Sequence, residues 1–237
     1  MDLRTPSVER LLDIWIDEDL GRGDLTQTAL NKTVVTAHWI SKQEGIFCGG
    51  GIVRKIFQRI DPSIEIEFLI KDGSPINTGQ RLLNIKGSAP ALIAGERPGL
   101  NLAMHLSGVA TATAMLVAEL KGTGVHLADT RKTTPGLRQM EKYAVRCGGG
   151  INHRMGLDDA AMLKENHIAW SNGIEEAIQA LRGTNPWTTK IIVEAENSKQ
   201  AEQAVTGGAD GVLLDGMTVQ LINSLVPRLR ELASMSN

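Results

Sequence analysis

The chain has 237 residues and a formal net charge of −2, with 42% apolar and 22% charged residues. This composition is ordinary for a folded protein of one large or two modest domains. Aromatic residues make up only 3%, which argues against nucleic-acid binding by base stacking. Cys48 and Cys147 are too few for a disulfide framework or a zinc site, which favours a cytoplasmic protein. The sequence shows neither a signal-peptide pattern nor a membrane-length apolar stretch, so we expect no membrane association.

The first third of the chain alternates one helical pattern with several strand-like segments. Apolar residues recur at helical spacing over residues 7–19, with Ser7 as the expected N-cap. Short β-prone segments follow at 34–41, 64–70 and 81–86, separated by glycine-containing turns, with a helix expected at 52–60. This pattern predicts an α+β module with an antiparallel sheet.

The rest of the chain changes to a repeating strand and helix pattern. Residues 89–120 are expected to form two helical pieces, broken near Ser107 and Gly108. Strands are expected at 125–129, 161–165, 191–196 and 211–215, with a fifth near 150–154, and helices at 174–181, 198–206 and 217–233. Alternating strands and helices predict an α/β, barrel-like domain of parallel strands. We therefore expect an N-terminal α+β domain over 1–107 and a C-terminal α/β domain over 108–237.

Basic residues gather in one short region of this nearly neutral chain. The segment Asp129-Thr-Arg-Lys-Thr-Thr-Pro-Gly136 supplies Arg131 and Lys132, and His153, Arg154 and Lys164 follow closely. Such a concentration favours one pocket for a small, highly anionic ligand over an extended nucleic-acid surface. Ionisable residues also stand at the carboxyl ends of the predicted strands, where βα barrels build their active sites; they are Asp129, Lys164, Glu194, Glu196 and Asp215.

Several polar residues in these segments have a simpler structural interpretation. A basic residue in a loop is usually solvated, and we assign Arg138, Lys142 and Arg146 to this class. His167 fits a ligand contact and a structural hydrogen bond equally well. Glu194 and Glu196 point to the same side of one strand, and Glu194 is chosen for the site because it lies deeper.

Ordered motifs along nearly the whole chain, from about Leu11 to about Arg230, resemble the quinolinate phosphoribosyltransferase family. The N-terminal motifs are Gly23-Asp-Leu-Thr26, Gly95-Glu-Arg97 and Leu106-Ser-Gly108. The later motifs are Asp129-Thr-Arg-Lys-Thr-Thr-Pro-Gly136, Glu141-Lys-Tyr-Ala144, Gly148-Gly-Gly150, Asn152-His-Arg154, Lys164-Glu-Asn-His167, Val193-Glu-Ala-Glu-Asn197 and Leu213-Leu-Asp215. A related branch that accompanies molybdate transport genes is the alternative within the family.

The resemblance implies a reaction of NAD biosynthesis. The ring nitrogen of quinolinate attacks C1 of phosphoribosyl pyrophosphate (PRPP), pyrophosphate leaves, and the 2-carboxylate is lost as CO2 to give nicotinate mononucleotide. The residues implied in substrate binding are Arg97, Arg131, Lys132, Thr133, His153, Arg154, Lys164, Glu194 and Asp215. Lys132, Lys164, Glu194 and Asp215 are the implied catalytic residues.

The resemblance also implies a metal ion and an assembly. Mg²⁺ accompanies PRPP, with Glu194 and Asp215 as its expected protein ligands, and no organic cofactor is expected. The family forms homodimers, or hexamers built from dimers, in which Arg97 is donated across the subunit interface.

The sequence departs from the family pattern in its last part. The family continues with two glycine-rich strand-loops that bind the ribose 5-phosphate, whereas this sequence ends about one helix after Asp215. We therefore expect the parallel domain to be incomplete at its C-terminus. A non-catalytic or truncated paralogue that binds quinolinate-like dicarboxylates is the alternative from another functional class.

Overall fold

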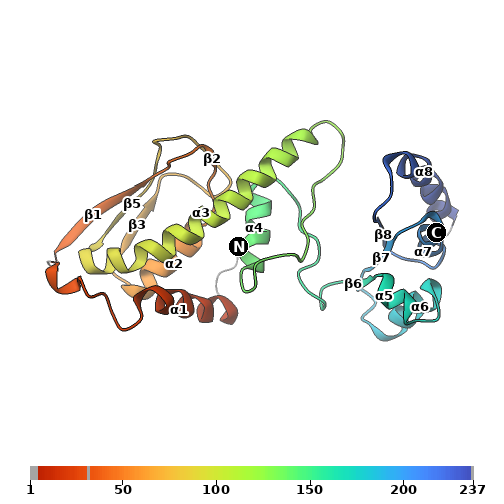
Figure 1. The fold of residues 1–237 in the computed structure, drawn as a ribbon, viewed down its shortest axis with the longest axis horizontal. Coiled ribbons are helices and arrows are strands. Elements are labelled where there is room, and N and C mark those ends of the chain that lie inside the picture. The colour runs from red at the N-terminus through yellow and green to blue at the C-terminus, as the bar shows by residue number, and fades with distance from the viewer. Residues whose placement is uncertain (1–4, 31–32, 236–237) are drawn as a thin grey trace. The chain divides into compact units, whose positions relative to one another are not determined.

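The protein is described by a computed structural model that covers residues 5–30 and 33–235 (Figure 1). The chain forms two compact units, unit 1 (Met1–His153) and unit 2 (Arg154–Asn237), each with its own sheet structure. The domain boundary predicted at 107 and 108 falls within a helix of unit 1 and remains a prediction.

An antiparallel sheet forms the N-terminal part of unit 1, as predicted. Its strands are β1 (Val34–Ile40), β3 (Glu65–Phe68) and β5 (Arg81–Ser88) in the order β1-β5-β3, and β2 (Gly45–Ile46) pairs with β4 (Pro75–Ile76). Leu83 and Ile85 of β5 form a core cluster with Val53 and Phe57 of helix α2 (Gly50–Ile60). Burial of these apolar side chains fixes the sheet face that carries the helix.

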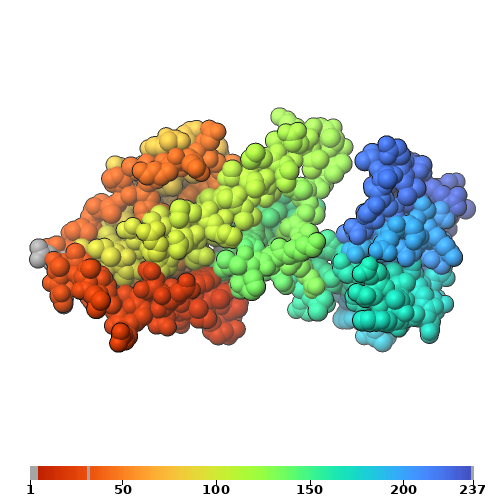
Figure 2. Space-filling view, viewed as in Figure 1, coloured from red at the N-terminus to blue at the C-terminus, as the bar shows by residue number. Residues whose placement is uncertain are grey.

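The N-terminal helix α1 (Pro6–Leu20) packs beside the long helix α3 (Ala89–Glu119), and Figure 2 shows the two in contact. Val8 and Leu12 bury their side chains in the core of unit 1. The predicted N-cap at Ser7 was wrong, because the cap residue is Thr5 and the helix begins at Pro6. Proline suits the first helical position, since it lacks the N–H that would go unpaired there.

Helix α3 is continuous, so the predicted break at Ser107 and Gly108 was wrong. The Ser107 hydroxyl accepts a hydrogen bond from the Cys48 N–H (2.9 Å) and donates one to the Cys48 carbonyl (3.1 Å). The Thr111 hydroxyl donates to the Ser107 carbonyl at 2.7 Å and accepts a hydrogen bond from the Ile46 N–H of β2 at 2.9 Å. A helical glycine costs only about 1 kcal/mol relative to alanine, and tertiary contacts on both sides of Gly108 outweigh that cost.

By length and composition, α3 also meets the criteria for a membrane-crossing helix. Its most apolar window of 18 residues has a mean hydropathy of 1.4. Helices of folded cores meet the same criteria, and α3 packs against α1, α2 and the later helix α4 (Arg138–Cys147).

The segment predicted as a strand at 125–129 is mostly irregular. A single parallel bridge joins Ala128 to Ile151, and the Asp129 N–H donates to the Ile151 carbonyl at 3.1 Å. Val125 is 60% exposed, so the segment does not have the burial that stabilises a strand in a parallel sheet. The fifth strand expected near 150–154 is likewise limited to this bridge.

Unit 2 contains the predicted parallel sheet with helices between its strands. The strands β6 (Ala161–Leu163), β7 (Ile191–Ala195) and β8 (Gly211–Leu214) pair in the order β6-β7-β8. The helices are α5 (Glu165–Ala169), α6 (Ile174–Thr184), α7 (Ser198–Thr206) and α8 (Val219–Met235). The predicted fold class, α+β followed by α/β with parallel strands, is confirmed.

Candidate functional site

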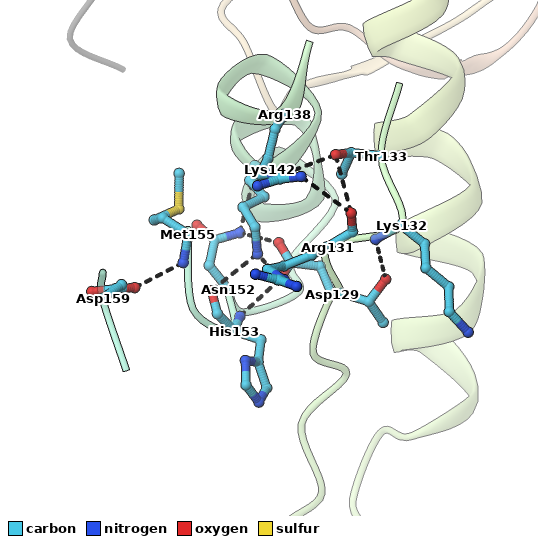
Figure 3. A network of polar contacts seen from close by, with 11 residues as sticks. Asp129, Arg131, Lys132, Thr133, Arg138, Lys142, Asn152, His153, Met155 and Asp159 are labelled. Atoms are coloured by element: carbon cyan, nitrogen blue, oxygen red, sulfur yellow. Dashed lines mark hydrogen bonds and ion pairs between the residues drawn. The ribbon is translucent and has the colours of Figure 1, made fainter. Parts of the chain in front are cut away.

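The Arg-Lys loop of unit 1, residues 129–133, is held by local hydrogen bonds before helix α4 (Figure 3). The Thr130 hydroxyl accepts from the Lys132 N–H at 3.0 Å. Arg138, at the start of α4, donates to the Thr133 hydroxyl at 3.1 Å and to the Arg131 carbonyl at 3.5 Å. The assignment of Arg138 as a solvated residue was therefore wrong, because its guanidinium forms hydrogen bonds that connect this loop to helix α4.

A buried ion pair lies behind the same loop. Lys142 of α4 donates to the Asp129 carboxylate at 2.5 Å, and the two side chains are only 1% and 9% exposed. The same carboxylate accepts hydrogen bonds from the Asn152 amide (2.6 Å) and the His153 N–H (2.8 Å). The assignment of Lys142 to solvent was wrong, because a buried ammonium next to a buried carboxylate avoids most of its desolvation cost.

A pocket of 320 Å³ lies on the side of the loop that meets α3 and α4. Asp129, Lys132, Glu141 and Lys142 are among its lining residues. Burial alone would raise the pKa of Glu141, but hydrogen bonds from Thr134 and His105 lower it. Glu141 therefore stays ionised, and the pocket wall carries both signs of charge.

Two predicted ligand residues of this region differ in exposure. The imidazole of His153 is directed away from the Lys142 ammonium and is half-buried (Figure 3). Lys132 is exposed, and its side chain extends away from the hydrogen-bond network (Figure 3). The orientation of Lys132 leaves its ammonium available to a ligand.

The polar ends of the strands in unit 2 come together as predicted. Lys164 follows β6 and donates to Glu194 of β7 at 2.6 Å, with the two side chains 42% and 18% exposed. A hydrogen bond with Glu165 raises the pKa of Glu196, and the charges of Glu165, Asp215 and Glu194 raise it further. One lysine and several carboxylates therefore share the carboxyl edge of the β6-β7-β8 sheet.

The remaining predicted residues lie in different settings. Arg154 opens unit 2, is 9% exposed, and donates to the Ala160 carbonyl at 2.9 Å. Arg97 is exposed on α3 in unit 1. His167, for which two interpretations were open, accepts a hydrogen bond from the Lys164 N–H at 3.3 Å and so caps α5.

Sequence reasoning missed the Asp129, Lys142 and Asn152 network. Asp129 was noticed only as the end of a predicted strand, and Lys142 was assigned to solvent. The periodicity of α4 gave no signal, because Lys142 stands two residues after the buried Met140 and two before the buried Ala144, and residues two apart lie on opposite sides of a helix. That spacing alone does not place a lysine inside, so its carboxylate partner was needed to identify it.

Comparisons with known proteins agree along the whole chain. Residues 24–107 match the model of the quinolinate phosphoribosyl transferase N-terminal domain, and residues 109–235 match that of the C-terminal domain. The chain is 41% identical to a probable nicotinate-nucleotide pyrophosphorylase [carboxylating] of Bacillus subtilis, over 93% of this chain and 78% of that protein. It is 38% identical to the protein of the same name from Synechocystis, over 94% and 76%.

A solved structure agrees with this assignment. The crystal structure of NadC from Streptococcus pyogenes matches with a TM-score of 0.92 at 33% identity, covering 100% of this chain and 88% of that one. Two domain models in order, curated relatives and a solved structure thus agree. The chain belongs to the quinolinate phosphoribosyl transferase family.

Proposed function

We propose that this protein transfers the phosphoribosyl group of PRPP to quinolinate and removes the 2-carboxylate as CO2. The observation that carries the proposal is the anchored loop of unit 1, in which Asp129 accepts a hydrogen bond from the His153 N–H and Arg131 and Lys132 follow closely in the chain. Quinolinate has two adjacent carboxylates, and arginine and imidazolium groups bind carboxylates by charge-assisted hydrogen bonds. The relatives bear the name of an enzyme of this reaction, which supports the same assignment.

Each group of residues has a distinct role in the proposed reaction. The carboxylates of quinolinate are bound by cationic side chains that orient its ring nitrogen toward C1 of the ribose: Arg131, His153, Arg154 and Lys164. Lys132 and Lys164 balance the charge of the leaving pyrophosphate. Glu194 and Asp215 bind ribose hydroxyls and stabilise the cationic ribosyl group as the bond to pyrophosphate breaks.

Decarboxylation follows from the new charge on the ring. Once the ring nitrogen is bonded to ribose, it is positively charged, and it stabilises the electron pair left on C2 as the carbon–carbon bond to CO2 breaks. A proton then replaces the lost carboxylate. The protein contributes position and exclusion of water, since the substrate supplies its own electron sink.

Mg²⁺ is proposed to enter with PRPP. In the described residues no group of three or more His, Cys, Asp or Glu side chains is arranged to hold a metal ion. Mg²⁺ commonly uses one or two carboxylates together with phosphate oxygens, so Glu194 and Asp215 fit a substrate-borne ion. When bound, the ion would neutralise charge on the leaving pyrophosphate.

A homodimer with shared sites is part of the proposal. Arg97 is exposed on α3, and the same helix exposes the large apolar side chains of Ile93 (44%), Met104 (58%) and Met115 (67%). Exposed apolar side chains on one helix favour contact with a second copy. We further propose a cytoplasmic location, in keeping with the free thiols of Cys48 and Cys147.

The site is tested by substituting its cations. Arg131→Ala, Arg154→Ala and Lys164→Ala should each weaken quinolinate binding by about 2–3 kcal/mol, because each removes a charge-assisted bond. Arg146→Ala is the matched control, since Arg146 is exposed and stacks on Tyr143. Titration calorimetry measures affinity, and release of labelled CO2 with PRPP and Mg²⁺ measures turnover. Unchanged quinolinate affinity in all three variants would disprove the pocket.

The shared site is tested by mixing inactive chains. If Arg97 acts across a dimer interface, mixing Arg97→Ala chains with Lys164→Ala chains should restore part of the activity, since one site of each mixed dimer keeps both groups. Light scattering reports the mass of the assembly. A monomer, or a dimer without recovery of activity, argues against shared sites.

A further inference from the structure

Lys142 is the most deeply buried charged side chain of the described residues, with a residue exposure of 0%. Lysine is rarely buried completely unless it is paired. Its ammonium donates to the Asp129 carboxylate at 2.5 Å and to the His153 carbonyl at 3.0 Å (Figure 3). Because this group is enclosed by protein, it acts through the residues it contacts.

The contacts of Lys142 join the Arg-Lys loop (residues 129–133) to the segment that precedes and includes His153. Asp129 accepts from the N–H of His153 at 2.8 Å, while Lys142 donates to the carbonyl of the same residue. Both backbone polar groups of His153 are thus held by the one ion pair. The position of the His153 backbone depends on that pair.

Asn152 extends the connection to the backbone of α4. Its amide donates to Asp129 at 2.6 Å and to the Lys142 carbonyl at 2.8 Å. The parallel bridge between Ala128 and Ile151, the residues that precede Asp129 and Asn152, adds a further contact between the two segments. Helix α4, the Arg-Lys loop and the His153 segment therefore meet at Asp129.

We propose that Lys142 is a positioning residue for dicarboxylate binding, holding His153 and, through Asp129, Arg131 at the spacing that two adjacent carboxylates require. This inference rests on the proposed function. Stability alone does not explain the pair, since replacing a buried ion pair by apolar side chains of similar volume is often neutral or stabilising. A buried pair with several directed hydrogen bonds does fix one geometry, and a cation displaced by about 1 Å can cost a reaction about 100-fold.

The test compares one variant that leaves an unpaired carboxylate with one that does not. Lys142→Met and the double variant Lys142→Met/Asp129→Asn should both raise the Kd and KM for quinolinate about 10- to 100-fold, while the KM for PRPP changes little. The double variant is included because removing both charges avoids a buried, unpaired carboxylate and so favours folding. Lys142→Arg should recover part of the affinity, since it keeps the charge.

Lys190→Met is the matched control. Lys190 is 72% exposed and pairs with Asp210 at 3.0 Å in unit 2, so the substitution removes a lysine from an ion pair that contains no proposed site residue. Its quinolinate affinity should equal that of the unsubstituted chain. A double variant that folds and binds quinolinate normally would overturn the positioning role and leave Lys142 as a structural residue.

Hydrogen exchange gives a readout that needs no ligand. The backbone N–H of His153, which donates to Asp129, should exchange faster in the double variant, whereas the amides of β7 should not change. Failure of the unsubstituted chain to bind quinolinate would disprove the proposed function but not the loop connection. Unchanged exchange at His153 would disprove the connection, whatever the chain binds.

Discussion

Two lysine–carboxylate pairs in this protein have almost the same length and opposite surroundings. Lys142 lies 2.5 Å from Asp129 in unit 1, and both side chains are nearly inaccessible. Lys164 lies 2.6 Å from Glu194 in unit 2, and its side chain is 42% exposed. The first carboxylate accepts two further hydrogen bonds, from Asn152 and His153. In unit 2, the Lys164 ammonium donates its hydrogen bond to the carboxylate of Glu194.

The difference teaches how one chemical pairing serves two purposes. A buried pair with its hydrogen bonds satisfied by protein cannot exchange partners, so it holds the backbone around it. An exposed pair contributes little to stability, because water and salt screen it. Such a pair can instead exchange partners with an anionic substrate. We therefore assign the first pair to positioning and the second to the reactants.

The largest expected effect is on the stability of unit 1. Lys142→Met leaves the Asp129 carboxylate buried without its cation, which should cost about 3–5 kcal/mol of unfolding free energy. Lys164→Met should cost less than about 1 kcal/mol. Urea unfolding, combined with hydrogen exchange to distinguish the units, measures both. Equal losses in the two variants would show that burial does not separate the pairs.

The second effect is a loss of catalysis with little change in stability. Glu194→Gln removes the charge that pairs with Lys164 and that we assign to the ribosyl group. We expect kcat/KM to fall by about 100-fold, while the free energy of unfolding changes by less than about 0.5 kcal/mol. Steady-state release of CO2 and urea unfolding supply the two numbers. Near-normal turnover in a strongly destabilised variant would contradict the assignment.

A third carboxylate lies between these extremes. Asp210 is 19% exposed and accepts from Arg182 at 2.6 Å and from the Ile191 N–H at 2.8 Å. Burial alone would raise the pKa of Asp210, but the hydrogen bonds from Ile191, Lys190 and Arg182 lower it from 3.8 to about 2. Because the pKa of Asp210 is lower in the folded state, its ionised carboxylate stabilises the folded protein above about pH 4. This stabilisation is lost as pH falls through about 2.

Asp210→Asn should therefore destabilise unit 2 by about 1–2 kcal/mol at about pH 5. The difference from the unsubstituted chain should shrink as pH falls through about 2, because Asp210 then becomes protonated in the folded state as well as in the unfolded state. Unfolding curves at several pH values check this, and Asp17→Asn, at an exposed carboxylate of α1, is the control. A difference that stays constant with pH would exclude ionisation of Asp210 as its cause.

The smallest expected effect is at the end of helix α4. It shows whether removing Lys142 changes only the surroundings of Asp129 or the whole helix. Cys147 ends α4, and a hydrogen bond with the Cys48 thiol lowers its pKa although burial opposes the shift. Its alkylation by iodoacetamide should therefore have a midpoint below about pH 8.5, the value of an ordinary thiol. The double variant Lys142→Met/Asp129→Asn should keep this midpoint. A shift to that of an ordinary thiol would mean that α4 as a whole had moved.

The periodicity of the sequence predicted most of the elements. The alternating burial in β5 and the helical spacing in α7 are visible in the local sequence, because the side of each element that packs against the core must be apolar. The residue types of Arg131, Lys132 and Lys164 also indicated an anionic ligand. Long-range contacts account for the errors. Ser107 bonds to Cys48 within the continuous helix α3, and in the part of the chain that the structure describes residues 125–129 form a single bridge instead of a strand.

The sequence by itself determined the fold class, the family and the chemical types at the site, because these depend on periodicity and on motifs of neighbouring residues. Tertiary structure alone decided which charges are buried. Lys142 and Lys164 are the same residue type, yet one is enclosed between α4, Asp129 and His153, whereas the other is partly open to solvent. Burial depends on contacts between residues distant in the chain, so no local pattern separates a positioning lysine from one that meets the substrate.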